Sequence, residues 1–458
     1  MRPSRVLVMT LVSFIVLCSF ASFSPAQTVN TVVTFDGTNG ANPRFGILTQ
    51  GRDGSLYGTT EQGGLYGLGT VYKLQTNGTI TVLHSFSGTD GSILEGGLTL
   101  GTDGNFYGAT GLGGTFSWGT LFRISPTGTF TVLYNFADGA DGALPVGAPI
   151  LASDGNFYGV SQGYPSFSTV YKLTPSGGFS TIYTFSTSGY PFTQPYQDKV
   201  GNLWVPLVNG GSFSVGELAE LTTAGVSQWN HSFNSRAGGE TSIGPVVQAP
   251  DGRIYGTTYN GGSNKSGTIY AVSSDGTVNS VYNFGSTSID GAFPEAGLTL
   301  ATDGNLYGTT DRGGSAAAGS LYQFSPNGAY QQLFSFPVPP DSAAPEATLL
   351  QHTNGKFYGT TGYGGGALGI VYSLNMGLAP FIGFVHPAGR VGQTAQILGQ
   401  GFTGTTSVTF NGVAATSFKV VTDTYMTVVV PSGATTGKVV VTTPAGALTS
   451  NVNFRIIN

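Results

Sequence analysis

Charged side chains are scarce in this sequence. Only 9% of the 458 residues are Asp, Glu, Lys or Arg, against about 25% in ordinary soluble domains. The 17 basic and 22 acidic residues leave a net charge of −5, and no stretch forms a basic stripe. Binding to DNA or RNA depends on cations that displace counterions, so this composition excludes a nucleic-acid partner.

Cysteine is nearly absent as well, since the only one, Cys18, lies inside the apolar run of residues 6–23. That run follows Arg2 and Arg5 and precedes the small-residue site that ends at Ala26, which predicts a signal peptide of residues 1–26. The mature chain then has no cysteine and a net charge of about −7. These features suit a protein exported by a bacterium to its surface or beyond.

Long apolar runs are missing from the rest of the chain, where none reaches the ~20 residues of a membrane-spanning helix. Leu17, just before Cys18, is too bulky for the usual bacterial lipoprotein signal, so we expect no lipid anchor. After signal cleavage, the chain is therefore predicted to contain no membrane span.

Glycine and apolar residues are abundant, in contrast. There are 73 glycines, 40% of the residues are hydrophobic and 12% are aromatic. No Gly-X-Y period is present, which excludes collagen. The apolar content is enough to bury a core, so the composition indicates a folded, turn-rich, all-β chain.

A unit of about 50 residues recurs seven times. Asp-Gly pairs mark five copies, Asn354-Gly355 marks the last, and Val200-Gly201 fills the fourth position. Each unit reads as four short strands separated by turn signals, with no helical segment between them. The sixth unit illustrates this pattern, with expected strands at 295–301, 305–310, 319–324 and 330–336. Four-stranded units at this period are typical of a β-propeller.

The last unit lacks a fourth strand, because the chain turns away after Leu374. Residues 28–35 match the missing strand and, like the fourth strands of other units, end on phenylalanine. We therefore predict a seven-bladed β-propeller over residues 28–376, in which the N-terminal strand completes the last blade and removes the exposed edges.

The repeated phrase itself is distinctive. Units of the form DGN-[FL]-YGTT-xxGG, followed by GT-[VL]-[FY]-x-[LI]-[ST]-P-x-G, resemble the GloVer-type tandem repeat of bacterial exported proteins. The resemblance covers all seven units, the fourth poorly. It implies a tandem-repeat exported protein and no defined enzyme activity.

The tail, residues 380–458, has alternating apolar and polar strands without the Asp-Gly phrase. It resembles the IPT/TIG family of immunoglobulin-like β-sandwiches. The matching residues are Gly399, Gly401, Phe402, Phe410 to Val413, Val430, Pro431, Gly437, Pro444 and Gly446. In bacterial exported proteins this family implies a spacer or a binding accessory.

The repeated polar and aromatic positions have structural interpretations. Asp-Gly suits a tight turn, since Asp bonds nearby backbone N–H groups and Gly accepts positive φ. Repeated aromatics, as at Tyr57 and Tyr72, favour packing between blades. The four histidines lack partners at metal-ligand spacing, so we predict no metal, no cofactor and no catalytic residue.

The variable loops are the predicted binding surface, because function tends to lie on loops held by a rigid scaffold. In a propeller, the connections between second and third strands share a face with those between blades, and here these connections are long and differ between units. Candidate binding residues on that face are Tyr66, Trp118, Tyr164, Tyr259, Tyr363, Asp90, Asp141 and Asp290.

These observations favour an exported, monomeric, non-enzymatic binding or adhesion protein that recognises a polysaccharide or a cell-surface partner. One alternative is a propeller-type glycoside hydrolase or lyase, which needs two carboxylates about 5–10 Å apart. The sequence nominates no such pair, and a cluster of charged residues at the channel mouth would favour this alternative. A structural envelope scaffold is the third possibility.

Overall fold

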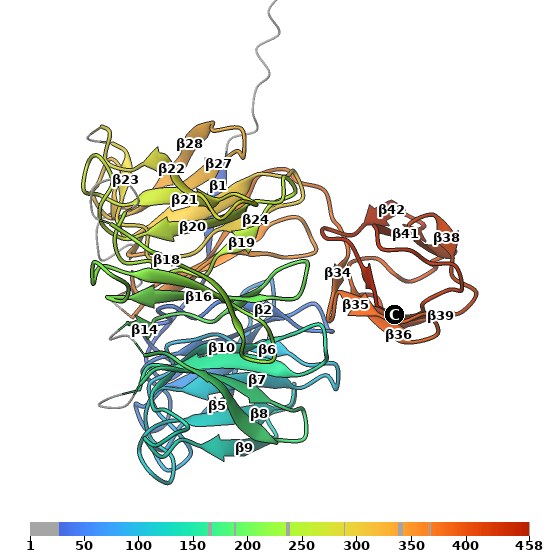
Figure 1. Cartoon of the computed structure of the whole chain (residues 1–458). Coiled ribbons are helices and arrows are strands. Elements are labelled where there is room, and N and C mark those ends of the chain that lie inside the picture. Colours follow the sequence, from blue (N-terminus) through green and yellow to red (C-terminus); the bar gives the residue numbers. More distant parts are fainter. Residues whose placement is uncertain are drawn as a thin grey trace, which may run out of the picture.

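The computed structural model describes residues 27–457 except 164–166, 187–188, 235–238, 288, 338–341, 365 and 367. Over these residues the chain is all-β, as the sequence predicts, and contains no helix. Within the same residues, therefore, no helix is long and apolar enough to cross a membrane. The strands form a large body of repeated antiparallel sheets and a smaller C-terminal unit (Figure 1).

Seven successive sheets, numbered here in chain order, make up the large body in the described ranges. Sheet 1 contains β2 (Thr49–Gln50), β3 (Leu56–Thr60), β4 (Thr70–Leu74) and β5 (Ile80–Ser85). Sheet 2 contains β6 (Thr99–Leu100), β7 (Phe106–Thr110), β8 (Thr120–Ile124) and β9 (Phe130–Asn135). Sheet 3 contains β10 (Pro145–Leu151), β11 (Phe157–Ser161), β12 (Thr169–Leu173) and β13 (Phe179–Thr184). Sheets 4 and 5 contain β14 (Tyr190–Pro191), β15 (Tyr196–Gln197), β16 (Leu203–Val208), β17 (Glu217–Leu221) and β18 (Ser227–Ser232); and β19 (Val247–Gln248), β20 (Ile254–Thr258), β21 (Thr268–Val272) and β22 (Val278–Asn283).

Sheet 6 contains β24 (Thr299–Leu300), β25 (Leu306–Thr310), β27 (Ser320–Phe324) and β28 (Tyr330–Ser335). Sheet 7 contains β30 (Leu350–Gln351), β31 (Phe357–Thr361), β33 (Ile370–Asn375) and, from the other end of the sequence, β1 (Thr28–Thr34). Two small pairs join loops of the last two sheets, namely β23 (Gly291–Ala292) with β26 (Arg312–Gly313), and β29 (Ser342–Ala343) with β32 (Tyr363–Gly364).

The repeated phrase D-G-N-L-Y-G-T-T is explained residue by residue in sheet 6. Asp303 accepts hydrogen bonds from the Asn305 N–H at 3.1 Å and from the Tyr307 hydroxyl at 2.8 Å. Gly308 leaves room for the buried ring of Tyr322 on the next strand. Thr309 donates to the Pro345 carbonyl of sheet 7 at 2.6 Å. Each position of the phrase therefore serves the turn, the sheet or the contact with the next sheet.

Apolar clusters join each sheet to the next. Tyr57 of sheet 1 stacks on Phe106 of sheet 2 at 4.0 Å between ring centroids, and Tyr107 stacks on Phe157 of sheet 3 in the same way. One buried cluster lies between every two neighbouring sheets among the described residues, including a cluster shared by sheets 7 and 1. The sheets therefore follow one another in a closed, propeller-like order.

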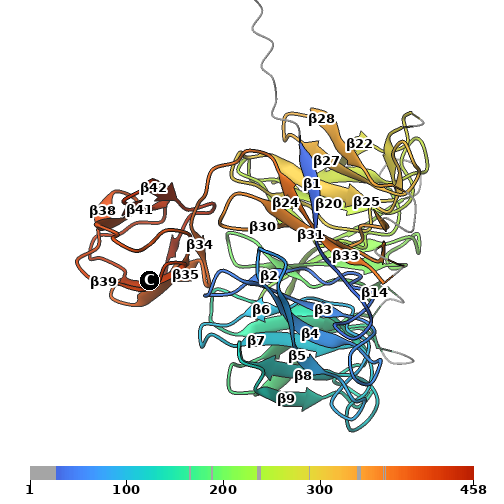
Figure 2. The ribbon, with the colours of Figure 1, turned by 180° about the vertical axis from the view of Figure 1, so that it is seen from behind.

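The two ends of the repeat region meet in sheet 7. β1 pairs antiparallel with β33 from Thr28 opposite Asn375 to Thr34 opposite Ile370. Figure 2 shows the blue β1 beside the orange strands of this sheet. Thr360 also donates to the Pro43 carbonyl at 2.8 Å, which joins sheet 7 to the segment before sheet 1.

In sheet 6 the first strand is shorter than the sequence predicts. Residues 295–301 were expected to form one strand, but β24 comprises only Thr299–Leu300. The segment before it lies against sheet 5, where a side chain on Gly297 would collide with Pro245. This close approach to sheet 5 accompanies the loss of pairing before Thr299 in sheet 6.

The C-terminal unit consists of two four-stranded antiparallel sheets and a short parallel pair. Its strands are β34 (Gly383–Phe384), β36 (Thr394–Leu398), β40 (Tyr425–Val429) and β39 (Phe418–Thr422); β38 (Val413–Ala414), β37 (Ser407–Phe410), β41 (Val439–Thr443) and β42 (Gly446–Thr449); and β35 (Ala388–Gly389) with β43 (Arg455–Ile456). The two larger sheets share a buried core that includes Ile397, Phe410 and Val441.

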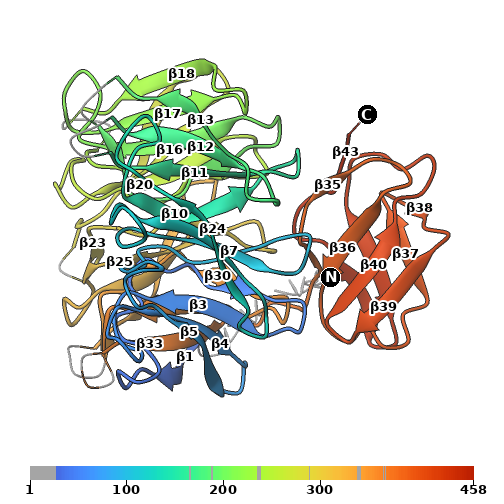
Figure 3. The same ribbon diagram turned by 90° about the horizontal axis from the view of Figure 1, so that it is seen from below.

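The C-terminal unit packs on the side of the large body that carries the Asp-Gly turns (Figure 3). Arg52, in the first of these turns, donates to Gln396 at 2.8 Å and lies over the ring of Tyr425. Tyr425 and Leu398 also join the apolar cluster between sheets 1 and 2. The unit therefore packs on the tight-turn side and leaves a cavity of about 840 Å³ against the turns of sheets 2 to 4. The long loops lie at the opposite ends of the strands.

Candidate functional site

The inner segments of all seven sheets line one small cavity. Its lining includes Phe45, Glu95, Gly147, Phe192, Ile243, Glu295 and Glu346. The cavity holds about 20 Å³, which is room for about one water molecule or ion. Three of its lining residues are glutamates at the same position of their repeats, just before the first strand.

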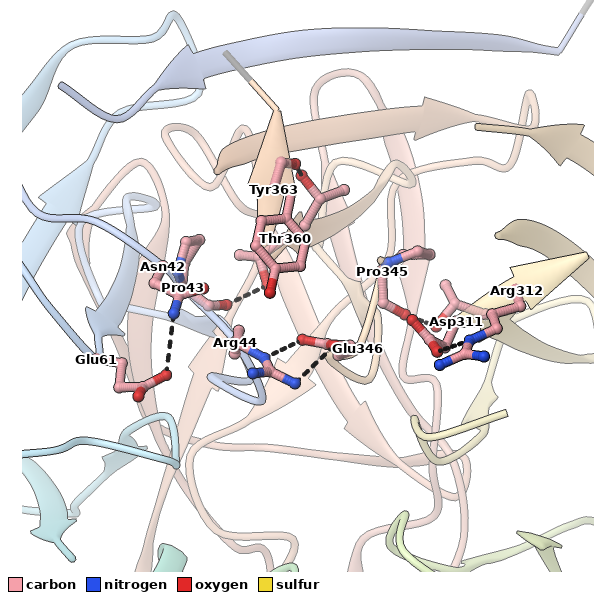
Figure 4. A network of polar contacts seen from close by, with 12 residues as sticks. Asn42, Pro43, Arg44, Glu61, Asp311, Arg312, Pro345, Glu346, Thr360 and Tyr363 are labelled. Carbon is pink, nitrogen blue, oxygen red and sulfur yellow. Dashed lines mark hydrogen bonds and ion pairs between the residues drawn. The ribbon is translucent and has the colours of Figure 1, made fainter. Parts of the chain in front are cut away.

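Glu346 anchors a charged cluster at this cavity (Figure 4). Arg44 Nε lies 2.5 Å from Glu346 Oε2 and Arg44 Nη2 lies 2.8 Å from Oε1, so the pair is bidentate. The Glu346 side chain is only 4% exposed and that of Arg44 is 30% exposed. Gly362 makes this pair possible, because a Cβ there would lie 2.9 Å from Arg44 and 3.0 Å from Glu346.

Glu295 and Asp311 complete the cluster. One oxygen of each of Glu295, Asp311 and Glu346 lies within 4.8 Å of the others. Asp311 follows β25 and pairs with Arg312 at 3.2 Å, as Figure 4 shows. Glu295 Oε2 is buried and has no hydrogen-bond partner among the described residues. We refer to Arg44, Glu61, Glu95, Glu295, Asp311, Arg312 and Glu346 as the acidic mouth.

Crowded carboxylates shift one another's protonation in the acidic mouth. Burial, followed by the charges of Glu346 and Asp311, raises the pKa of Glu295 to about 8. Burial raises the pKa of Glu346 as well, although the hydrogen bond and charge of Arg44 oppose that shift. Burial and the neighbouring Glu61 raise the pKa of Glu95. At neutral pH Glu295 therefore keeps its proton, beside a Glu346 side chain that Arg44 holds with two hydrogen bonds.

The acidic mouth could bind a hard cation, since carboxylate oxygens at this spacing suit Ca²⁺ or Mg²⁺. However, Glu346 already gives both oxygens to Arg44. Only Glu295 and Asp311 of the three carboxylates then remain for a metal. Two ligands are fewer than a dedicated protein site for calcium usually supplies.

Two predicted aromatic residues lie beside the acidic mouth. Tyr363, in β32, is 44% exposed, and Figure 4 shows it near Arg44. Tyr259 packs against Phe293 with 5.2 Å between ring centroids. Burial, then the charges of Asp311 and Glu295, raises the pKa of Tyr259. The structure thus brings these two tyrosines to the same site.

The other predicted aromatics are farther around the same loops. Tyr66 is exposed at the tip of the loop between β3 and β4. Trp118 is half-buried against the cluster between sheets 2 and 3, and its carbonyl accepts the Leu144 N–H. Tyr164 lies outside the described residues.

The three predicted aspartates have bonds within their own loops. Asp90 lies 2.8 Å from His84 Nε2 and accepts the Ser87 N–H. Asp141 and Asp290 accept the hydroxyls of Tyr134 and Tyr282 at 3.1 and 3.0 Å. They occupy equivalent positions after the fourth strand, so each closes the connection to the next sheet. This arrangement gives them a role in holding the loops.

The acidic mouth was not among the residues predicted from the sequence. Glu95, Glu295 and Glu346 share one repeat position, eight residues before the turn Asp or Asn, and that recurrence was a signal. Arg44 carried no such signal, since it reaches Glu346 only across the junction of sheets 1 and 7.

Together, the repeated sheets and the converging inner segments define an all-β tandem-repeat protein of propeller-like architecture. The chain belongs to the Gloeobacter/Verrucomicrobia repeat family, which matches residues 19–218 and 190–418. No curated protein matches the sequence.

Solved structures with a similar fold have little sequence identity. Virginiamycin B lyase from Staphylococcus aureus matches with a TM-score of 0.52 and 12% identity, over 76% of this chain and 98% of its own. A fungal alcohol oxidase of the AA5 family, in complex with copper, matches with a TM-score of 0.53 and 14% identity, over 94% of this chain and 99% of its own. At such identities the likeness concerns the fold alone.

Proposed function

We propose that this protein is an exported glycan-binding protein whose binding site is the acidic mouth. In this proposal the seven sheets are the blades of a seven-bladed propeller, and residues 380–458 are an immunoglobulin-like domain of the IPT/TIG type that serves as a spacer. The signal peptide of residues 1–26 would direct the chain out of a bacterial cell, where it acts as a monomer.

The observation that carries the proposal is the gathering of unlike polar groups at one end of the central cavity. Glu295, Asp311 and the Arg44–Glu346 pair come from three sheets and meet beside Tyr363. Buried, mutually perturbed carboxyl groups in a hollow are a mark of functional sites. The cavity itself has room for about one water molecule, so in this proposal the sugar binds at its rim, where Tyr363 and Arg312 are exposed.

The chemistry of the acidic mouth suits sugar hydroxyls. Carboxylates accept hydrogen bonds, arginine donates them, and an exposed tyrosine ring offers an apolar face with a polar tip. Five acidic residues face only two arginines here, so the local field disfavours anionic glycans. The expected ligands are therefore neutral sugars or sugars that carry an amino group.

A glycan array probed with the full mature chain tests this function, with affinities then measured by calorimetry. Asp311→Asn and Tyr363→Ala should each weaken binding about tenfold, the cost of one hydrogen bond to a charged group or one ring contact. Asp275→Asn is the matched control, since Asp275 is an exposed turn carboxylate bonded to Thr277 N–H. An array without any bound glycan, or equal losses in the control, would refute the proposal.

A second candidate, a glycoside hydrolase, is favoured by the contrast between Glu295 and Glu346. A carboxyl group that keeps its proton near neutral pH can act as a general acid beside an ionised partner. The 4.8 Å limit on their oxygens is slightly below the ~5–5.5 Å of retaining enzymes. Product analysis of a bound glycan decides between them. If the wild type cleaves the glycan and Glu295→Gln binds it without cleavage, the protein is a glycoside hydrolase. If the wild type leaves the bound glycan intact, the protein is a binding protein.

A further inference from the structure

Large aromatic side chains stand at the tips of the loops in the first half of the repeat region. Tyr66, Phe116 and Phe213 are 58%, 55% and 61% exposed. Each lies in the loop between the second and third strands of its sheet, in sheets 1, 2 and 4. Phe167, in the corresponding loop of sheet 3, is 60% exposed.

The turn that contains these residues is closed by a backbone hydrogen bond that does not involve their aromatic side chains. In sheet 1 the Gly67 N–H donates to the Gly64 carbonyl at 3.3 Å, and in sheets 2 and 4 the same bond joins Ser117 to Gly114 and Ser214 to Gly211. The residue that donates this bond has a φ between 55° and 74° in all three loops. The aromatic residue is the one immediately before it.

Sheets 5 and 6 contain the same turn with other residues at this position. Lys265 donates to Gly262 at 3.3 Å and Ala317 to Gly314 at 3.1 Å, again with positive φ. The preceding residues are Asn264 and Ala316. The same backbone therefore forms with a small or polar side chain, and an exposed aromatic ring in water contributes little to folding. The rings in sheets 1, 2 and 4 require another explanation.

We propose that Tyr66, Phe116 and Phe213, called here the tip arc, bind separate, non-adjacent units of one neutral polysaccharide chain, because packed sheets lie about 10 Å apart. This inference rests on the proposed function and extends it, because it adds a polymer track beside the acidic mouth. Sheets 1 to 4 are consecutive neighbours, joined by shared apolar clusters. A linear polymer that crosses them would meet one ring after another, and several weak contacts on one chain combine into strong binding.

The lack of charge on the loops of the tip arc favours an uncharged polymer as the ligand. The loop segments 63–69, 113–119 and 210–216 contain no charged side chain. A membrane-binding surface usually combines apolar residues with Lys or Arg, which these tips lack. The acidic mouth, which lies on the same side of the large body and includes Glu61 of the Tyr66 loop, would disfavour both anionic lipids and acidic polysaccharides. Flat rings that stack on the C–H face of a sugar, without a charge, fit a neutral glycan best.

Affinity electrophoresis in gels that contain soluble glucan, xylan, mannan or a polyuronate tests the tip arc. The test variant is Tyr66→Asn with Phe116→Ala and Phe213→Ala, which inserts side chains that the same turn accepts in sheets 5 and 6. Its thermal unfolding should match that of the wild type. We expect retardation by at least one neutral polymer and about 100-fold weaker apparent affinity in the triple variant, from the loss of multivalency.

Short oligosaccharides of the same polymer provide the internal comparison. Because a disaccharide spans too few rings to gain from the tip arc, its affinity should change less than threefold in the triple variant while Asp311→Asn lowers it.

The outcomes separate the two proposals. A glycan array without any bound glycan refutes the glycan-binding function itself. Binding on the array without wild-type retardation in any neutral gel refutes only the tip arc. If Asp311→Asn weakens the retardation and the triple variant is retarded as strongly as the wild type, only the tip arc is refuted. Two further results would overturn the tip arc as a glycan site. If the wild type cosediments with phosphatidylglycerol vesicles and the triple variant does not, the arc binds a lipid surface. If the wild type is a dimer in analytical ultracentrifugation and the triple variant is a monomer, the arc binds a second copy of the chain.

Discussion

Arg44 and Glu346 form a bidentate ion pair across 302 residues of sequence. Arg44 precedes sheet 1 and Glu346 precedes sheet 7, so the pair bridges the junction where the repeat region closes. It lies at the central cavity, whose lining also includes residues that precede or belong to the first strands of the other five sheets. One contact thus belongs both to the closure of the fold and to the candidate site.

Removal of either partner should destabilise the protein by about 2–3 kcal/mol, because it leaves a desolvated charge without its hydrogen bonds. The free energies of unfolding of Arg44→Met, Glu346→Gln and the double variant, measured in urea, give the coupling between the two residues. Lys73→Met is the control, since its partner Asp53 is 39% exposed, against 4% for Glu346, and loss of that pair should cost less than about 1 kcal/mol. Equal losses in all single variants would contradict the expectation.

Stability should fall as the pH rises from about 4.5 to about 8, because the pKa of Glu295 is raised to about 8 in the folded protein. Below its unfolded pKa the carboxyl is protonated in both states and costs nothing. Between the two values the folded state binds more protons than the unfolded state, so stability decreases with pH. Glu295→Gln removes this dependence. The melting temperature of the variant minus that of wild type should therefore increase from pH 5 to pH 9, and a constant difference would argue against the shift.

Gly308→Ala should destabilise sheet 6, because the added Cβ would lie less than 3.0 Å from the buried Tyr322 ring. Such overpacking in a core costs about 1–3 kcal/mol. Gly383→Ala, whose Cβ would meet Thr353 at an ordinary 3.8 Å, serves as the control. Thermal melts of both variants check the prediction, which fails if the two behave alike.

The turn aspartates should tolerate asparagine better than alanine. Asp303 accepts the Tyr307 hydroxyl and the Asn305 N–H, whereas sheet 7 uses Asn354 to contact Tyr358 at 3.1 Å. Asp303→Asn should therefore cost less than about 0.5 kcal/mol and Asp303→Ala about 1–2 kcal/mol. Urea unfolding distinguishes them. A larger loss in the asparagine variant would mean that the charge itself matters.

The repeated residues allowed most of the fold to be predicted. Asp303, Tyr307 and Gly308 recur because each makes a local contact that every sheet needs, in the turn or against the next strand. Contacts repeated in every sheet produce a periodic pattern in the sequence. Sheet 4 is less regular because its turn acid has moved to Asp198, which bonds the Trp204 indole N–H at 3.0 Å. Asp198 preserves the bond between the turn acid and the aromatic residue, but its changed position makes the repeat harder to find in the sequence.

The candidate site was harder to predict, because it depends on departures from the repeat. Arg44 has no equivalent in other units, and its partner Glu346 is distant in sequence. An acid at the position of Asp311, eight residues after the turn Asp, recurs only as Glu61 in the first unit. The glutamates at positions 95, 295 and 346 were visible as a column, but nothing in linear order shows that this position faces the centre. Only the radial arrangement of the sheets turns that column into a cluster.

The pairing of β1 with β33 bears on how the chain reaches its native state. Residues 28–34 are among the first described in the sequence, yet their partners, residues 370–375, come more than 300 residues later. Such a high contact order means that closure must await nearly the whole repeat region and pay a large loop entropy. Sheets 1 to 6 can form from local hairpins meanwhile, with β1 unpaired. We therefore expect refolding in two stages, with fast local assembly and a slower final step in which the ends of the repeat region join.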